Sequence, residues 1–389
     1  MGVRNTFSGL FLQPISRDLG WGREIFSLAV AVQNLLWGAA QPFVGYLTDR
    51  HGAARVLLAG ALLYALGLSA AALLPTPWVF GLSAGVLLGL GIACTTYTVA
   101  YSVLGRMVEP SRRAWAFGVS AAAGSLGQVA LLPAAQGLIE AVGWVATLLW
   151  LSALTALIAP LGLYFAGLGR LGSDPSRAGE GAAPTASARE ALADACGDRS
   201  FWLLNLGYFV CGFQVVFIGA HLAPYLADCG LPANVSVTAL ALIGLFNVAG
   251  TYAAGALASS LPKRYVLSAI YGLRSLVIVV FLALPLTAWS VYLFAAAIGL
   301  LWLSTVPPTN ALVAQIYGAR HLGLLGGIVF FSHQVGSFLG AWLGGRLFDL
   351  TGSYQMVWWL AIALGVFATV IHWPIDERAL ETRRLCVAR

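Results

Sequence analysis

The sequence predicts an all-α membrane protein of twelve transmembrane helices, of which the first is short. Hydrophobic residues make up 59% of the 389 positions, charged residues make up only 9%, and the mean hydropathy is +0.84. A soluble protein of this size needs more polar surface than this composition supplies. The apolar runs are too long for barrel strands, and a helix is the only open-ended element that satisfies its own backbone in lipid.

One crossing needs about 20 apolar residues, and runs of this kind recur along the whole chain. The predicted spans are 1–16, 24–47, 54–74, 78–104, 114–140, 144–168, 201–226, 236–258, 265–284, 289–316, 322–348 and 354–374. At roughly 1.5 Å per residue the first span barely crosses the hydrocarbon. We therefore expect the sequence to start inside its first helix.

A change of composition divides the chain into two halves. Residues 170–199 are rich in Ser, Pro, Ala, Gly and charged residues, which is typical of a solvated linker. The linker separates an N-terminal half of six helices, 1–169, from a C-terminal half, 200–376. A short tail, 377–389, follows.

The basic residues predict the orientation in the membrane. With the amino terminus inside, sixteen of the 21 basic residues fall on the cytoplasmic side and three on the opposite side. By the positive-inside rule, both termini lie in the cytoplasm, and the expected location is a bacterial cytoplasmic (inner) membrane. The net charge of +6 therefore reflects orientation in the lipid bilayer, and we expect no nucleic-acid partner.

A charged stretch, Gly-Tyr-Leu-Thr-Asp-Arg-His-Gly-Ala-Ala-Arg, lies between the second and third spans. It resembles the signature loop of the major facilitator superfamily, Gly-x-Leu-x-Asp-Arg-x-Gly-x-x-Arg. The resemblance implies a major facilitator fold, in which two parallel six-helix repeats alternate access to a site at mid-membrane. Glycine permits the close approach and the turn, and the two central charges can pair across the hinge. The predicted gating residues are Gly45, Asp49, Arg50, Gly52 and Arg55.

The resemblance extends to both halves. Residues 255–264 align with the charged stretch after the second helix of the C-terminal half, although the aspartate is lost. Residues 2–7, 20–27 and 332–340 resemble the bacterial monocarboxylate-transporter-like branch, which is related to oxalate/formate exchangers. The Asp and Arg that animal monocarboxylate transporters carry in helix eight correspond to Asn247 and Thr251. Their proton-coupling scheme therefore does not transfer directly to this chain.

Three ionisable residues lie at membrane depth, namely Arg4, Arg274 and His333. Ionisable residues at this depth are rarely kept without a partner or a function. The acidic residues nearest to them fall at helix ends. Buried positive charge without a carboxylate favours an anion as the missing partner. A guanidinium can clamp a carboxylate, and a histidine can take a proton as the anion binds. Alternatively, Arg4 snorkels, Arg274 braces backbone carbonyls, and His333 is a packing residue.

These considerations give the candidate site. The predicted substrate-binding residues are Arg4, Arg274, His333, Gln334, Asn34, Tyr97 and Asn310. Further lining candidates are Gln33, Gln41, Thr95, Thr96, Tyr101, Thr309 and Ser337, for which interhelical hydrogen bonding is the alternative.

The predicted function is secondary active transport of a small organic anion, with a monocarboxylate as substrate and a proton as coupling ion. Anion exchange and efflux of drugs or metabolites are alternatives within the same fold. A membrane-embedded enzyme needs converging catalytic groups, which the sequence lacks, and a sensor needs a larger output domain than the tail provides. The five cysteines lack metal-site spacing and no phosphate-binding loop is present. We therefore predict no catalytic residues, no metal and no cofactor.

Overall fold

The computed structural model describes residues 2–96, 99, 113–171, 188–318 and 322–380, and all regular elements within them are helical. In the N-terminal half the elements are α1 (Gly2–Leu10), α2 (Leu12–Leu19), α3 (Arg23–His51), α4 (Ala53–Leu73), α5 (Pro77–Phe80), the π-helical η1 (Gly81–Leu87), α6 (Leu88–Thr95), α8 (Arg113–Ala156) and α9 (Ile158–Leu171). The rest of the chain contains α10 (Ala188–Cys196), α11 (Arg199–Asp228), α12 (Ala233–Ser260), α13 (Lys263–Ala283), α14 (Ala288–Leu301), α15 (Val306–Tyr317), α16 (Leu322–Thr351) and α17 (Gln355–His372).

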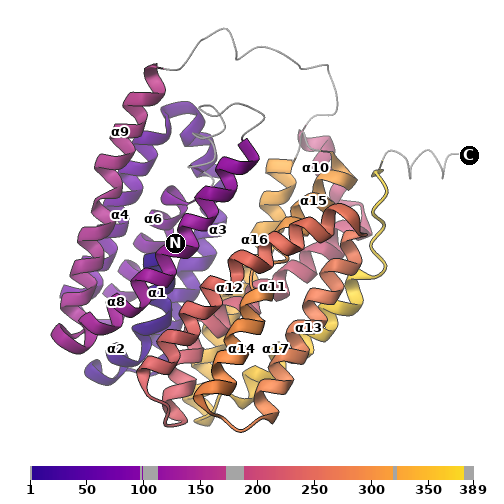
Figure 1. Cartoon of the computed structure of the whole chain (residues 1–389). Helices are drawn as coiled ribbons and strands as arrows, with labels where there is room; N and C mark the ends of the chain where they lie inside the picture. The colour runs from indigo at the N-terminus through magenta and orange to yellow at the C-terminus, as the bar shows by residue number, and fades with distance from the viewer. Residues whose placement is uncertain (1, 97–98, 100–112, 172–187, 319–321, 381–389) are drawn as a thin grey trace, which may run out of the picture.

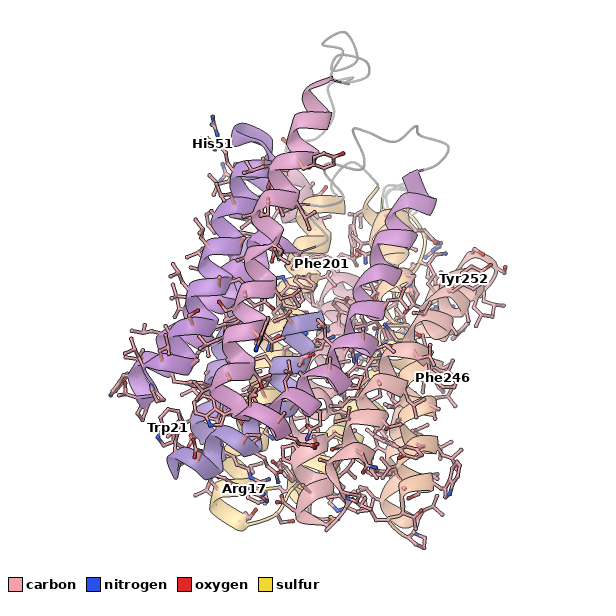
Figure 2. All side chains as sticks on the ribbon, turned by 60° about the vertical axis from the view of Figure 1, so that its left-hand side comes forward. Arg17, Trp21, His51, Phe201, Phe246 and Tyr252 are labelled. Carbon is pink, nitrogen blue, oxygen red and sulfur yellow. The ribbon has the colours of Figure 1, made fainter. Side chains whose placement is uncertain are left out.

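The helices form two bundles that lie side by side (Figure 1). The end of the molecule at which α9 ends and α10 begins is called the linker end. The opposite end, called the far end, carries Arg17 and Trp21, whereas His51 lies toward the linker end (Figure 2). Helix α1 lies at mid-height of the N-terminal bundle (Figure 1). Its side chains therefore lie at about half the depth of the protein.

Nine helical stretches of the described residues are long and apolar enough to cross a membrane. One of them, Leu126–Tyr164, contains two spans, because Gly143 takes a positive φ of 80° and turns the chain within α8. The α1–α2 pair and α3 supply the first two spans. The arrangement therefore confirms the predicted all-helical membrane fold of twelve spans.

Two local features differ from the expected pattern. Helix α10 forms inside the segment expected to be a solvated linker, because Leu192 and Ala195 pack on the apolar cluster of the C-terminal half. The tenth span is not one helix but is interrupted between Leu301 and Val306. Pro307 and Pro308 follow the interruption, and proline, which has no N–H, is tolerated in the first turn of α15 but not inside a continuous helix.

The two halves meet mainly along three helix pairs, α3 with α16, α8 with α12, and α1 with α11, and α2 also contacts α11. The approach of α3 to α16 is close at Gly38, where a Cβ atom would lie 2.6 Å from Cγ of Gln334. A second close approach brings Gly345 against Ser27. Small residues at these crossings allow helices from different halves to pack directly.

Candidate anion-binding site

Arg4 of α1 points to the boundary between the halves and is held by amide oxygens. Its Nη2 donates to Oδ1 of Asn34 on α3 at 2.5 Å, and its Nη1 donates to Oδ1 of Asn5 at 3.0 Å. Its guanidinium carbon lies 4.9 Å from the centroid of the Trp37 ring, a cation–π contact. The structure thus brings the predicted residues Arg4 and Asn34 together at mid-depth.

A row of rings extends from Arg4 into the C-terminal half. Trp37 meets Phe330 of α16 edge to face, with centroids 5.4 Å apart. Phe330 stacks on the imidazole of His333 at 5.8 Å, and Tyr208 of α11 packs on the same imidazole at 4.9 Å. The rings of Trp37 and Phe330 therefore connect Arg4 with His333 across the boundary between the halves.

His333 and Gln334 belong to one polar group on α16. Nδ1 of His333 lies 3.2 Å from Oε1 of Gln334, and the hydroxyl of Ser337 donates to that oxygen at 3.2 Å. Gln334 and Ser337 are fully buried, and His333 is nearly so. The partners of the imidazole among the described residues include no carboxylate, and the thiol of Cys211 on α11 also bonds it.

The interhalf region is rich in hydrogen-bond donors that have no acceptor. Nε of Arg4, Nε1 of Trp37 and Nε2 of Gln334 are buried without a partner, and so is the hydroxyl of Tyr64, which interacts electrostatically with Arg4. The unpartnered acceptor on α3, Oε1 of Gln33, belongs to a side chain that bonds the Ala84 carbonyl of η1. Buried donors without acceptors are costly. A group that only accepts hydrogen bonds is the type of partner that such donors lack.

No negatively charged side chain among the described residues pairs with Arg4. The ion pairs among the described residues are Arg23–Asp228, Arg346–Glu24 and Arg378–Asp376, and none of them involves Arg4 or Arg274. A carboxylate offers four lone-pair positions and can bind a guanidinium with both oxygens. The arrangement can therefore bind a small anion electrostatically.

Arg274 of α13 occupies a different place, at the interruption of the tenth span. Its Nε donates to the Leu301 carbonyl at 2.9 Å, and its Nη2 donates to the carbonyls of Leu301 and Trp302. Asn247 of α12 accepts from the N–H of Leu303 at 3.0 Å and from the Thr251 hydroxyl at 3.1 Å. These contacts favour the alternative in which Arg274 supports carbonyls that the interrupted helix leaves free.

The other predicted residues are scattered. Asn310 is exposed and donates to the Val306 carbonyl of its own helix at 2.9 Å, and Thr309 is buried. Gln41 and Thr96 bond each other at 3.1 Å, and Thr95 bonds the Gly91 carbonyl at 2.8 Å. Tyr97 and Tyr101 lie outside the described residues.

At the predicted gating loop, Gly52 ends α3 with a positive φ of 83° and precedes the first residue of α4. This is the turn for which glycine was expected. Arg55 is exposed on α4. Gly45, Asp49 and Arg50 lie in α3, and the side chains of Asp49 and Arg50 are outside the described ones.

A polar cluster at the far end was not predicted. Arg23 donates to both carboxylate oxygens of Asp228 at 2.6 and 2.7 Å and to the Tyr354 hydroxyl at 2.9 Å. Burial raises the pKa of Tyr354 above its ordinary value, so the phenol keeps its proton, and its oxygen lies 3.1 Å from Nδ1 of His221. The carboxylate of Asp349 accepts from the backbone of α3. Opposite charges at helix ends were the only sequence signal for this cluster.

Comparison with known proteins places this geometry in context. A family model described as Major Facilitator Superfamily matches residues 1–341. The MFS-type transporter YcxA of Bacillus subtilis (strain 168), described as uncharacterized, is 27% identical over 388 residues, which cover 95% of this chain and 90% of YcxA. Human monocarboxylate transporter 11 is 28% identical over 92% of this chain and 74% of its own length. Bovine monocarboxylate transporter 13 is 26% identical over 94% and 83%.

Proposed function

Because the chain belongs to the Major Facilitator Superfamily of transporters, we propose that it moves a small monocarboxylate across the membrane by alternating access. The observation that carries the substrate class is the set of buried, unpartnered donors that includes Nε of Arg4, together with the lack of an ion pair to Arg4 from any described carboxylate. The relatives named monocarboxylate transporters support the same class of substrate.

In this proposal the anion binds at Arg4. The Arg4 guanidinium and the free N–H groups of Trp37 and Gln334 bind the carboxylate at the interhalf region, while Asn34 fixes the orientation of the guanidinium. The ring of Trp37 offers an apolar surface to the short carbon chain of the substrate. None of the ion pairs in the described part of the chain involves Arg4, so its charge is available to the ligand.

We further propose that His333 binds the coupling proton. An imidazole changes charge near neutral pH, and His333 faces Arg4 across Trp37 and Phe330. A proton there offsets the charge of the bound anion as both cross. The basic residues on the linker side support a cytoplasmic linker end, in a bacterial cytoplasmic membrane.

A thermal-shift experiment tests the substrate class. Acetate, lactate, pyruvate and oxalate are titrated into the purified protein, since a ligand that prefers the folded state raises the melting temperature. We expect a monocarboxylate to raise it in wild type and in the control Arg17→Lys, where an exposed arginine changes at the far end. Arg4→Lys loses the two-pronged geometry and should respond less. No response to any carboxylate in wild type would contradict the proposal.

A further inference from the structure

Three hydrogen bonds in series run from Arg4 across the boundary between the halves. Nη1 of Arg4 donates to Oδ1 of Asn5 at 3.0 Å, and Nδ2 of Asn5 donates to Oε1 of Gln128 on α8 at 2.7 Å. Nε2 of Gln128 then donates to the Leu240 carbonyl of α12 at 3.0 Å. The first two bonds lie within the N-terminal half, and the third joins it to the C-terminal half.

Both ends of this series fix its direction. A guanidinium can only donate hydrogen bonds, and a backbone carbonyl can only accept them. The amides of Asn5 and Gln128 can therefore complete all three bonds in only one orientation. A change at the first bond removes the partner that fixes the Asn5 amide, and through Asn5 it affects Gln128.

The surroundings of Gln128 fit a specific contact between the halves. Gln128 is 9% exposed. The facing residue on α12 is Gly244, where a Cβ atom would lie 3.2 Å from Cδ of Gln128 and press on its amide. Glycine at this position leaves room for the glutamine to reach the Leu240 carbonyl.

We propose that Gln128 is a positioning residue that ties the two halves together in the empty protein, and that an anion bound at Arg4 releases this tie. The proposal rests on the function proposed above. A carboxylate that accepts from the N–H group of Arg4 Nη1 to which Asn5 is bonded takes the place of the Asn5 Oδ1. Asn5 is then free to turn, Gln128 loses its fixed orientation, and the bond to the Leu240 carbonyl weakens. Occupancy of the site thereby favours separation of the halves.

The tie can be measured without a ligand by the distance between spin labels at the far end. Trp78→Cys and Trp289→Cys place labels at exposed positions near the starts of α5 and α14, one in each half. Cys196, Cys229 and Cys386 are replaced by serine. In Gln128→Leu we expect the ratio of long to short distances to rise about two- to tenfold, the range that loss of one neutral hydrogen bond produces.

The matched control is Gln136→Leu. It makes the same change on α8, at a side chain that bonds Glu140 of its own helix at 2.7 Å, and it should leave the distances as in wild type. Pyruvate should raise the ratio of long to short distances in wild type and in the control. In Gln128→Leu it should raise this ratio little further.

A second variant keeps the test decisive if Gln128→Leu does not fold. When protonated, the side chain of Gln128→Glu can still donate to the Leu240 carbonyl and accept from Asn5, whereas the ionised form can only accept. In Gln128→Glu the ratio of long to short distances should therefore rise with pH more than it does in wild type. Ligand-free distances unchanged by both variants would overturn the tie. A wild type that binds no carboxylate, while the ligand-free distances respond to Gln128→Leu, would instead contradict the proposed function.

Discussion

Arg23 of α3 and Asp228 of α11 form a two-pronged ion pair across the two halves, with N–O distances of 2.6 and 2.7 Å. The guanidinium also lies 3.7 Å from the centroid of the Phe348 ring, so it is stacked as well as paired. This geometry fixes the guanidinium in one plane. The far end of the molecule is therefore joined at a specific charged contact.

Removing the charge of Asp228 should loosen the far end. Both side chains are partly exposed, and we expect a coupling free energy of about 1 kcal/mol between Arg23→Gln and Asp228→Asn, the upper range for a pair reached by water. The double-mutant cycle is measured from the ratio of long to short distances between spin labels at Trp78→Cys and Trp289→Cys. Strictly additive effects of the two substitutions would show that the pair does not hold the halves together.

Gly22 should tolerate no larger residue while Asp349 is in place. The Asp349 carboxylate caps α3 by accepting from the N–H groups of Arg23 at 3.0 Å and Glu24 at 2.7 Å, and a Cβ atom at Gly22 would lie 2.7 Å from its Oδ2. Gly22→Ala should therefore displace the Asp349 carboxylate and lower the free energy of unfolding by about 1 kcal/mol.

Two further variants separate this steric effect from a general effect of alanine. In the Asp349→Ala background, Gly22→Ala should cost little more, because the carboxylate that it displaces is gone. Gly81→Ala places a Cβ where nothing lies within 4 Å and should be neutral. If Gly22→Ala lowered the free energy of unfolding equally in both backgrounds, the Asp349 carboxylate would not cap α3.

Arg274→Met should destabilise the protein more than it alters anion recognition. The substitution leaves the Leu301 and Trp302 carbonyls without their donor at the interruption of the tenth span. An unsatisfied buried polar group costs about 1–3 kcal/mol, which thermal unfolding in detergent can measure. If the variant instead kept its melting temperature and lost its preference among carboxylates, Arg274 would belong to the binding site.

His333→Gln should flatten the pH dependence of uptake while anion selectivity persists. Glutamine can still bond Ser337 but cannot gain a proton, whereas an imidazole can. The charged or titratable groups that face His333 are Tyr208 and Cys211 of α11. Uptake is measured across pH, with His221→Gln at the far end as the comparison. An unchanged profile in His333→Gln would place the proton elsewhere.

The sequence predicted the architecture because the physics of lipid leaves few choices. Apolar run length and the positions of Gly52 and Gly143 decide where helices cross and turn. Run length could not reveal that the tenth span is interrupted, since the Trp302 region is as apolar as a continuous helix. The helix bounds and the bonds from Arg274 to the Leu301 and Trp302 carbonyls show it.

The candidate site was predicted in part. Charge at depth singled out Arg4 and His333, because an unpaired cation in a membrane is costly wherever it lies. The roles of Asn5 and Gln128 depend on which helices of the two halves face each other, and a single sequence does not contain that information. The same holds for the far-end contact of Arg23 with Asp228, which are 205 positions apart.

Uptake of radiolabelled monocarboxylates into proteoliposomes tests the central claim most directly, that Arg4 binds an anion which the protein carries across the membrane. We expect saturable uptake of at least one of acetate, lactate and pyruvate, with an unchanged KM in Arg17→Lys. In Arg4→Lys the KM should rise about tenfold, the equivalent of about 1.4 kcal/mol of binding free energy. Absence of saturable uptake by the folded wild type, or a wild-type KM in Arg4→Lys, would contradict the account.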